Sequence, residues 1–369
     1  MNELGLIKTD PWLKPFEPII ARRYQLLRNK KNELLTLNES LADFATSHFF
    51  YGMHKTLTGW VFREWAPNAK KIYLVGAFSH WQTTEQFALK PIGDGNWEIT
   101  LDEATLAHGD LYKLHMQWHN GSGDRLPAYA TRVCQDPSTL IFTAQVWHPA
   151  TQYTWKNKTY HSHTEAPLIY EAHIGMSSED DKMSTYNEFR ENVLPRIVKG
   201  GYNTIQFMAI QEHPYYGSFG YHVSNFFAAT SKFGTPEDLK TLVDEAHKHG
   251  INVIMDLVHS HAVKNEVEGL SRFDGSYDQY FYPGDKGFHP AWDSRCFDYG
   301  KPNVLKFLLS NIRYWLEEYK FDGYRFDGVT SMLYHNHGLE VNFTSYADYL
   351  KGDEDENAMT YLALANDLM

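Results

Sequence analysis

An arginine and an aspartate stand two positions apart in the segment GYRFD, residues 323–327. If this segment is a β-strand, alternation places Arg325 and Asp327 on the same face. A guanidinium beside a carboxylate keeps that carboxylate ionised and positioned, as a nucleophile at neutral pH requires. The pair also fits an ordinary structural ion pair, so the spacing alone leaves both interpretations open.

A second carboxylate and a histidine follow another apolar run. Asp256 stands near the end of the run INVIMDLV, residues 251–258, and His261 lies five residues further on. In a β/α barrel the chemistry is carried at the carboxyl ends of the strands. We therefore expect both side chains at the mouth of such a barrel, with a simple loop cap as the alternative for Asp256.

A glycine-spaced aromatic loop, YYGSFGYH at residues 215–222, is the third candidate. Its rings can stack on a sugar ring, and its tyrosine hydroxyls can donate hydrogen bonds. A packed loop is the alternative. The three segments follow three successive predicted strands, which favours one shared site over three unrelated features.

The elements that carry these segments alternate between strand and helix from residue 167 onward. Predicted strands cover 168–173, 203–207, 251–258 and 321–327, and predicted helices cover 186–199, 236–249 and 304–319. This alternation indicates a parallel sheet, open or closed. A closed barrel has eight β/α units and four are present. We therefore predict that residues 151–369 form the N-terminal half of a (β/α)8 TIM barrel.

The first 150 residues have a different pattern, which makes the predicted chain multidomain. Residues 1–50 are predicted to be helical, because Asp10-Pro11 suits a helix start and Ile20, Tyr24 and Leu27 have amphipathic spacing. Residues 51–150 contain short aromatic and β-branched runs separated by Gly, Asn, Asp and Pro. Without helices between them, these runs predict an all-β sandwich.

Composition excludes several classes of protein. The net charge of −12 argues against a nucleic-acid partner. Cys134 and Cys296 are the only cysteines, so neither a disulfide framework nor a cysteine metal cluster is expected, and a reducing compartment fits. No apolar stretch is long enough to predict a membrane span. We expect a soluble cytoplasmic protein.

From residue 168 onward the chain resembles the alpha-amylase superfamily of glycoside hydrolases (glycoside hydrolase family 13), and within it the glycogen and starch branching enzymes. The longest matching run, YKFDGYRFDGVTSMLY at residues 319–334, is typical of branching enzymes of eukaryotes and some bacteria rather than of amylases generally. The other matching motifs are YEAHIGMS (170–177), FGY (219–221), NFFA (225–228), GTPEDL (234–239), DLVHSHA (256–262) and WDSR (292–295).

The front of the chain fits the same family. The motifs REWAPNA (63–69) and VGAFSHW (75–81) resemble a carbohydrate-binding module of the family 48 type, and DPWLKP (10–15) with RRY (22–24) resembles the helical extension before it. On this module Trp81 and Trp97 are candidate platforms for stacking on glucan, with burial in the core as the alternative for each.

Carried over by position, the resemblance implies that Asp327 is the nucleophile, which takes the cleaved glucan as a covalent β-glycosyl intermediate. It implies that Arg325 orients this nucleophile. Tyr221, Asp256 and His261 are implied to line the subsite where the sugar ring is bound and distorted.

The resemblance also implies the reaction and its partners. Trp292, in the WDSR motif, becomes a further substrate-binding residue. The reaction is a retaining double displacement on α-1,4-glucan, in which a sugar 6-hydroxyl replaces water as the acceptor and an α-1,6 branch forms. Glycogen or amylose is the expected partner, no cofactor or metal is required, and the full-length parent is expected to be a monomer.

The resemblance places the general acid, a glutamate, after a fifth strand and a His-Asp pair after the seventh. We expect both beyond Met369, so that the chain as given ends after its fourth β/α unit and is inactive by itself; general acid help is worth ~10²–10⁴ in rate. The acidic run at residues 353–356 (DEDE) is predicted to be solvated surface charge rather than a substitute.

Two other functions stay open at this stage. One is an alpha-glucan hydrolase or debranching enzyme with the same fold. The other is a non-catalytic glucan-binding protein built on the same scaffold. The complete set of Tyr221, Asp256, His261, Arg325 and Asp327 weighs against the second, because a protein that only binds glucan needs no nucleophile.

Overall fold

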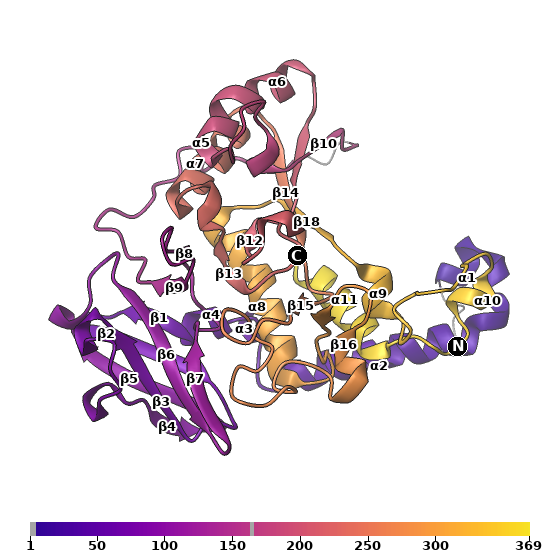
Figure 1. Cartoon of the computed structure of the whole chain (residues 1–369). Helices are drawn as coiled ribbons and strands as arrows, with labels where there is room; N and C mark the ends of the chain where they lie inside the picture. Colours follow the sequence, from indigo (N-terminus) through magenta and orange to yellow (C-terminus); the bar gives the residue numbers. More distant parts are fainter. Residues whose placement is uncertain (1–4, 163–165) are drawn as a thin grey trace.

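The computed structural model describes residues 5–162 and 166–369, so the first four residues of the predicted N-terminal segment lie outside the described ranges. Along the chain it has a helical N-terminal segment, a β-sandwich and a parallel β/α unit (Figure 1). The predicted fold class is therefore confirmed, including the partial barrel.

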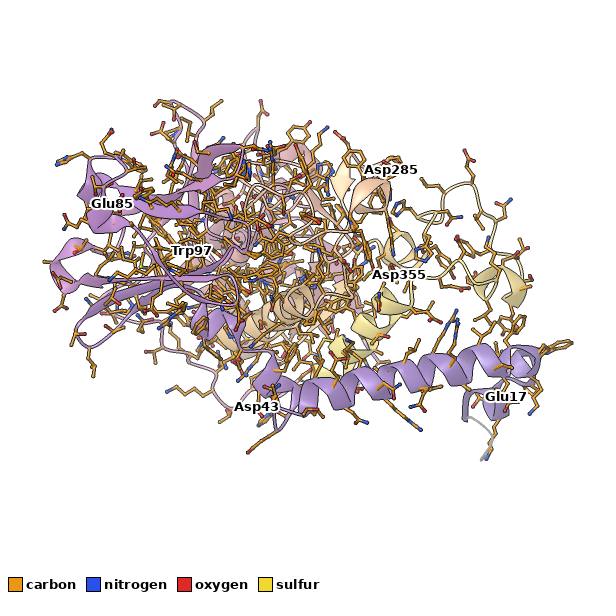
Figure 2. The ribbon with its side chains drawn as sticks, turned by 90° about the horizontal axis from the view of Figure 1, so that it is seen from below. Glu17, Asp43, Glu85, Trp97, Asp285 and Asp355 are labelled. Atoms are coloured by element: carbon orange, nitrogen blue, oxygen red, sulfur yellow. The ribbon has the colours of Figure 1, made fainter. Side chains whose placement is uncertain are left out.

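The N-terminal segment contains α1 (Gly5–Thr9), a 3₁₀ helix (Pro11–Phe16) and the long helix α2 (Glu17–Leu35). Asp10 caps the 3₁₀ helix by accepting from the Trp12 amide at 3.1 Å, as the Asp-Pro pair predicts. In Figure 2, α2 is the straight helix that begins at Glu17 and runs toward Asp43. Two short helices, α3 (Leu41–Phe44) and α4 (Ser47–Phe50), then lead into the sandwich.

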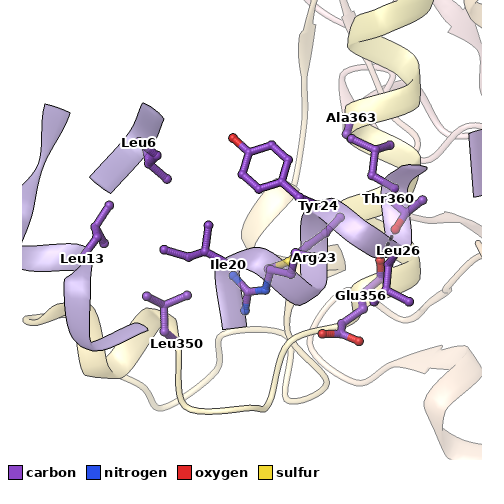
Figure 3. Close-up of a pocket in the computed structure, with 12 residues that line it drawn as sticks. Leu6, Leu13, Ile20, Arg23, Tyr24, Leu26, Leu350, Glu356, Thr360 and Ala363 are labelled. Atoms are coloured by element: carbon purple, nitrogen blue, oxygen red, sulfur yellow. Dashed lines mark hydrogen bonds between the residues drawn. The ribbon is translucent and has the colours of Figure 1, made fainter. Parts of the chain in front are cut away.

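Helix α2 packs on the last helix of the chain, α11 (Glu356–Leu368). Ion pairs join Arg22 to Glu356 at 2.5 Å and Lys31 to Asp367 at 2.6 Å. An apolar cavity of about 280 Å³ lies at one end of this contact. Figure 3 shows that its walls come from the N-terminal helices, from α11 and from Leu350, which precedes α11. The N-terminal segment thus covers the end of the chain.

The sandwich consists of two antiparallel sheets. One sheet has the order β1 (Gly52–Lys55), β2 (Gly59–Trp65), β5 (Asn96–Asp102) and β4 (Lys90–Gly93). The other has the order β3 (Lys71–Gly76), β6 (Leu111–Trp118), β9 (Phe142–Gln145) and β8 (Val133–Gln135), with β7 (Gly121–Arg125) paired to β6. Phe62 and Leu114, one from each sheet, are fully buried, so the core lies between the sheets.

The β/α unit is built on a parallel sheet with the order β10 (Ile169–Ala172), β11 (Thr204–Phe207), β14 (Asn252–Leu257) and β18 (Gly323–Phe326). The connections contain a helical run over residues 186–199 (α5, a π turn and α6), α7 (Pro236–Lys248) and α8 (Pro302–Tyr319). The predicted buried strand near residue 170 is half-exposed, because β10 forms one edge of this open sheet.

Small elements extend the loops that follow the strands. After β11 come β12 (Gln211–Glu212) and β13 (Asn225–Ala229), which pair antiparallel. After β14 come β15 (Ala262–Val263), β16 (Phe288–His289) and β17 (Ser294–Arg295), which form a three-stranded sheet. After β18 come α9 (Val329–Leu333) and α10 (Tyr346–Tyr349). These additions fix the loops that carry the predicted site residues.

The prediction that residues 353–356 are solvated surface charge is wrong for its two central members. Glu354 and Asp355 are buried. Asp355 caps α11 by accepting from the amides of Asn357 and Ala358, and it also accepts from the Tyr282 hydroxyl at 2.7 Å. Glu354 forms an ion pair with Arg23 at 3.2 Å. Partners distant in the sequence draw this acidic run inward.

The prediction of Trp97 as a glucan platform is also wrong. Trp97 lies on the inner face of β5 with 8% of its surface exposed (labelled in Figure 2), and its indole N–H donates to the Ala66 carbonyl at 3.0 Å. Trp81, in the turn that follows β3, is 46% exposed. Only Trp81 keeps a surface that a ligand can reach.

In residues 5–162 and 166–369, no helix combines the length and the apolar character needed to cross a membrane. Cys134 and Cys296 are both free thiols.

We predict that Asp355→Ala destabilises the protein by about 2–4 kcal/mol, because a helix cap is lost and the buried Tyr282 hydroxyl loses its acceptor. Thermal unfolding measures the change. Asp353→Ala is the matched control, because the Asp353 side chain makes no hydrogen bond or ion pair within the described part of the chain. Equal unfolding midpoints for the two variants would contradict the buried role of Asp355.

Candidate active site

Asp256 is the centre of a hydrogen-bond network at the carboxyl end of β14. Its carboxylate is fully buried. Oδ1 accepts from Gln206 Nε2 at 2.8 Å, and Oδ2 accepts from the Tyr221 hydroxyl at 2.6 Å and from Arg325 Nη1 at 2.9 Å. Three elements therefore contribute donors to one buried carboxylate: β11, the loop after it, and β18.

Arg325 connects this buried carboxylate to a more accessible one. The pairing of β14 with β18 sets Arg325 opposite Asp256, and Nη1 also donates to Asp327 Oδ1 at 2.7 Å. Charge-assisted bonds of this length fix both side chains. Asp327 is partly exposed, and its Oδ2 accepts no hydrogen bond from the described residues. The predicted Arg325–Asp327 contact is confirmed, and the second Asp327 oxygen has no hydrogen-bond partner among the described residues.

The aromatic loop reaches the same place through Tyr221, whose main chain contacts His261. Besides the Tyr221 hydroxyl bond to Asp256, His261 Nε2 lies 2.8 Å from the Tyr221 carbonyl oxygen, so Nε2 carries the proton and donates it. Nδ1 then accepts from the Ser260 hydroxyl at 2.9 Å. Because both ring nitrogens are engaged within the protein, His261 holds the Tyr221 main chain in place in this structure.

Trp292 forms a wall of the site. Its ring is stacked on His289, with centroids 4.1 Å apart and planes at 4°, and its centroid lies 4.9 Å from that of His261. A Cβ placed on Gly328, the residue after Asp327, would lie 3.2 Å from the indole. The side chain is 37% exposed. Trp292 thus presents an aromatic surface beside Asp327.

Burial and charge shift the proton affinities of these groups. Burial raises the pKa of Asp256, although the Tyr221 hydroxyl and the Arg325 guanidinium act against this shift. Partial burial acts to lower the pKa of Arg325, but the nearby carboxylates of Asp256 and Asp327 outweigh this effect and raise it. Burial lowers the pKa of His261 to about 3, against the hydrogen bond to the Tyr221 carbonyl. The Arg325 guanidinium, a permanent cation, therefore lies between Asp256 and Asp327, and the nearby imidazole of His261 is neutral at pH 7.

The structure brings together six of the seven predicted site residues: Tyr221, Asp256, His261, Trp292, Arg325 and Asp327. The seventh, Trp81, lies on the sandwich, outside this cluster. Within residues 5–162 and 166–369, no three His, Cys, Asp or Glu side chains are arranged to hold a metal ion.

Sequence reasoning missed Gln206 and Ser260. Gln206 is a buried polar residue within β11 and bonds to Asp256. A glutamine inside an otherwise apolar, buried strand is the signal that could have identified it, because a buried amide needs a partner. Ser260 offers no comparable signal, since its contact with His261 depends on the conformation of the loop.

Two family models match the chain. Residues 50–137 match carbohydrate-binding module 48 (isoamylase N-terminal domain), and residues 201–296 match the alpha amylase catalytic domain. The curated 1,4-alpha-glucan-branching enzyme of Dictyostelium discoideum is 46% identical over 98% of this chain and 54% of its own length. The branching enzyme of Yarrowia lipolytica is 48% identical over 99% of this chain and 54% of its own.

The chain is similar over nearly its whole length to curated 1,4-alpha-glucan-branching enzymes, at 42–48% identity. It spans about half the length of the curated relatives it matches. A plant enzyme is similar as well: the 1,4-alpha-glucan-branching enzyme 2-2 of Arabidopsis thaliana is 43% identical over 99% of this chain and 46% of its own length.

Solved structures agree with the fold of this chain. The catalytic module of the glycogen-degrading pneumococcal virulence factor SpuA superposes with a TM-score of 0.64 over 86% of this chain and 49% of its own, at 19% identity. Pullulanase from Bacillus acidopullulyticus gives 0.62 over 77% of this chain and 38% of its own, at 22% identity.

We predict that Gln206→Leu lowers kcat/KM on amylose about 10- to 100-fold in the full-length protein, because a hydrogen bond to a charged group is worth about 1.5–3 kcal/mol. Thr204→Val is the matched control: Thr204 is buried on the same face of β11 but bonds to Asn203 rather than to Asp256. An equal loss in both variants would mean that β11 packing, not the bond to Asp256, is responsible.

We also predict acid destabilisation from neutral buried histidines. Burial lowers the pKa of His259 to about 3, although its bond to Asn311 acts against this shift. The unfolded chain therefore binds a proton below about pH 6.5 that the folded protein excludes until about pH 3, so the stabilisation is complete above pH 6.5 and is lost as pH falls. From pH 6.5 to 5 the loss is about 2 kcal/mol for this histidine.

Urea unfolding at several pH values checks this expectation. His259→Gln, which cannot titrate, should flatten the dependence between pH 6.5 and 5. His119→Gln, at an exposed histidine, should leave it as in the wild type. An unchanged slope in His259→Gln would show that this histidine titrates alike in the folded and the unfolded protein.

Proposed function

We propose that the protein is a glycogen branching enzyme, which cleaves α-1,4-glucan and transfers the cleaved segment to a 6-hydroxyl to form an α-1,6 branch. One observation carries the proposal: Arg325 holds the candidate nucleophile Asp327 against the buried Asp256. It does so in a chain whose curated relatives are named branching enzymes at 42–48% identity.

In the first step Asp327 attacks the anomeric carbon of the glucan, and the bond to the leaving oxygen breaks. Asp327 is suited to this role because Oδ1 is held by Arg325 while Oδ2 accepts no hydrogen bond within the described part of the chain. A carboxylic acid about 5–5.5 Å away protonates the leaving oxygen in retaining enzymes. The glutamate that the resemblance assigns to this acid, after a fifth strand, is part of the proposal.

In the second step a glucan 6-hydroxyl attacks the glycosyl–Asp327 intermediate, and the same acid, now a base, removes the hydroxyl proton. Water competes for this intermediate, so the site must bind and orient the acceptor chain. Trp292 supports this role, because its partly exposed ring lies beside Asp327. Tyr221, Asp256 and His261 form the subsite for the sugar that is cleaved.

The rest of the chain supports capture of a polymeric substrate. We propose the division 1–50, 51–150 and 151–369, with the middle part binding glucan through the exposed Trp81. Strands β1 to β9 fall within the middle range. The two free thiols, Cys134 and Cys296, support a cytoplasmic location. We propose that the protein is a monomer.

Incubation of the full-length protein with amylose tests the function. Branching removes the iodine colour without producing new reducing ends, whereas hydrolysis produces reducing ends. Asp327→Asn should lower turnover at least ~10³-fold, since it removes the nucleophile. Asp94→Asn is the matched control, because Asp94 is exposed and its φ of 52° suits asparagine.

The two alternatives give different results in the same assay. New reducing ends from the wild type would favour a hydrolase or debranching enzyme. Glycogen binding without turnover, unchanged by Asp327→Asn, would favour a non-catalytic glucan-binding protein. Either result would overturn the proposal.

A further inference from the structure

We infer that the β-sandwich positions the active-site wall that carries Trp292, so that the sandwich acts on the reaction as well as on glucan capture. This inference rests on the proposed function, because it concerns the same site. The connection runs through residues 264–293, which join β15 to β17 and are called the wall segment below. Figure 1 shows this segment beside the edge of the sandwich that carries β7.

The first contact is a buried carboxylate shared between the two parts. Asp274 of the wall segment is fully buried. Its Oδ2 accepts from the Asn68 amide N–H at 3.0 Å and from Asn68 Nδ2 at 2.9 Å, and its Oδ1 accepts from the Ser276 amide and hydroxyl. A buried carboxylate is tolerated only when such bonds are made. Asn68 therefore fixes the wall segment at one orientation.

The second contact is a close approach of backbone to sandwich. Arg125, at the end of β7, donates to the carbonyls of Arg272 and Phe273 at 2.9–3.1 Å. Gly275 has a φ of +93°, and a Cβ at this position would lie 2.1 Å from the Trp118 indole. Only glycine permits both this backbone conformation and this distance. The wall segment is thus docked at residues 272–276.

The wall segment transmits this position to β17. The Tyr277 ring contacts two guanidinium groups, with its centroid 5.1 Å from Arg272 and 5.6 Å from Arg295. Arg295 also donates to the Tyr277 carbonyl at 2.7 Å. Gln279 makes a separate bond back to the sandwich, donating to the Trp65 carbonyl at 2.6 Å. A chain of packed and hydrogen-bonded groups therefore links the sandwich to β17 without a gap.

Strand β17 belongs to the small three-stranded sheet that lies beside the site. Arg295 pairs with Ala262, the residue after His261, and Ser294 pairs with His289, on which Trp292 is stacked. A shift of the wall segment therefore moves Trp292 relative to Asp327. Small displacements of positioning groups lower rates strongly, so Asn68 is a positioning residue although it belongs to the sandwich.

The experiment measures branching kinetics and local hydrogen exchange in the full-length protein. Asn68→Ala should lower kcat/KM on amylose about 5- to 50-fold, mainly through KM, because Trp292 binds substrate. Gln86→Ala, at an exposed amide elsewhere on the sandwich, is the control and should match the wild type. Amide exchange in peptides covering residues 286–296 should increase in Asn68→Ala only.

A double-variant comparison separates positioning from general loss of stability. If Asn68 acts through Trp292, the double variant should have a kcat/KM less than about 2-fold below that of Trp292→Ala alone. If the two residues act independently, their separate fold-losses in kcat/KM multiply. A purely structural role would give the full loss in both backgrounds. If Asn68→Ala does not fold, Gln279→Ala removes the separate bond to Trp65 and is measured in its place.

The outcomes distinguish the inference from the proposed function. Unchanged kinetics and unchanged exchange in Asn68→Ala, with an active wild type, would overturn the inference and leave the branching activity standing. The inference would also be overturned if the loss of kcat/KM in the double variant equalled the product of the losses in Asn68→Ala and Trp292→Ala. If the wild type does not branch amylose, the proposed function fails, and the exchange experiment still decides whether the sandwich holds the wall.

Discussion

The bridge from Arg325 to Asp256 and Asp327 is the interaction on which the site depends. It exists because parallel pairing of β14 with β18 sets Arg325 opposite Asp256, while alternation along β18 brings Asp327 to the same face. Asp256 is fully buried, and an isolated buried carboxylate would be costly. Arg325, Tyr221 and Gln206 offset that cost with three hydrogen bonds. The accessible Asp327 is held in place by a group that is itself fixed.

Much of the surrounding structure holds this bridge and its neighbours in place. His261 fixes the main chain of Tyr221, and Ser260 fixes the orientation of His261. The wall segment carries Trp292 to the site and is fastened to the sandwich through Asp274. At the other end of the chain, α2 packs along α11 through ion pairs. Contacts distant in the sequence therefore join the three parts of the chain.

The errors of the sequence interpretation have a common physical cause. Glu354 and Asp355 lie in a run of four acidic residues, which is typical of a solvated surface. In the fold, two of the four acidic residues are buried because they have partners. Glu354 pairs with Arg23, and Asp355 accepts from the Tyr282 hydroxyl and from two helix amides. The prediction for Trp97 was wrong for a related reason: its position on β5 directs the indole into the core, where glucan cannot reach it. The hydrogen-bond partners of a side chain, and the side of a sheet on which it lies, depend on contacts between distant parts of the chain. Local composition gives no information about these contacts.

The sequence by itself determined the order of the elements, the fold class and the segments that carry the candidate chemistry. Periodicity and the motif around Arg325 and Asp327 are local properties, so they can be identified from the sequence alone. Only the tertiary structure decided that Gln206 bonds to Asp256, that both nitrogens of His261 are engaged within the protein, and that Trp292 stands beside Asp327. These facts depend on strand register and loop conformation. Both are fixed by contacts between residues that are far apart along the chain.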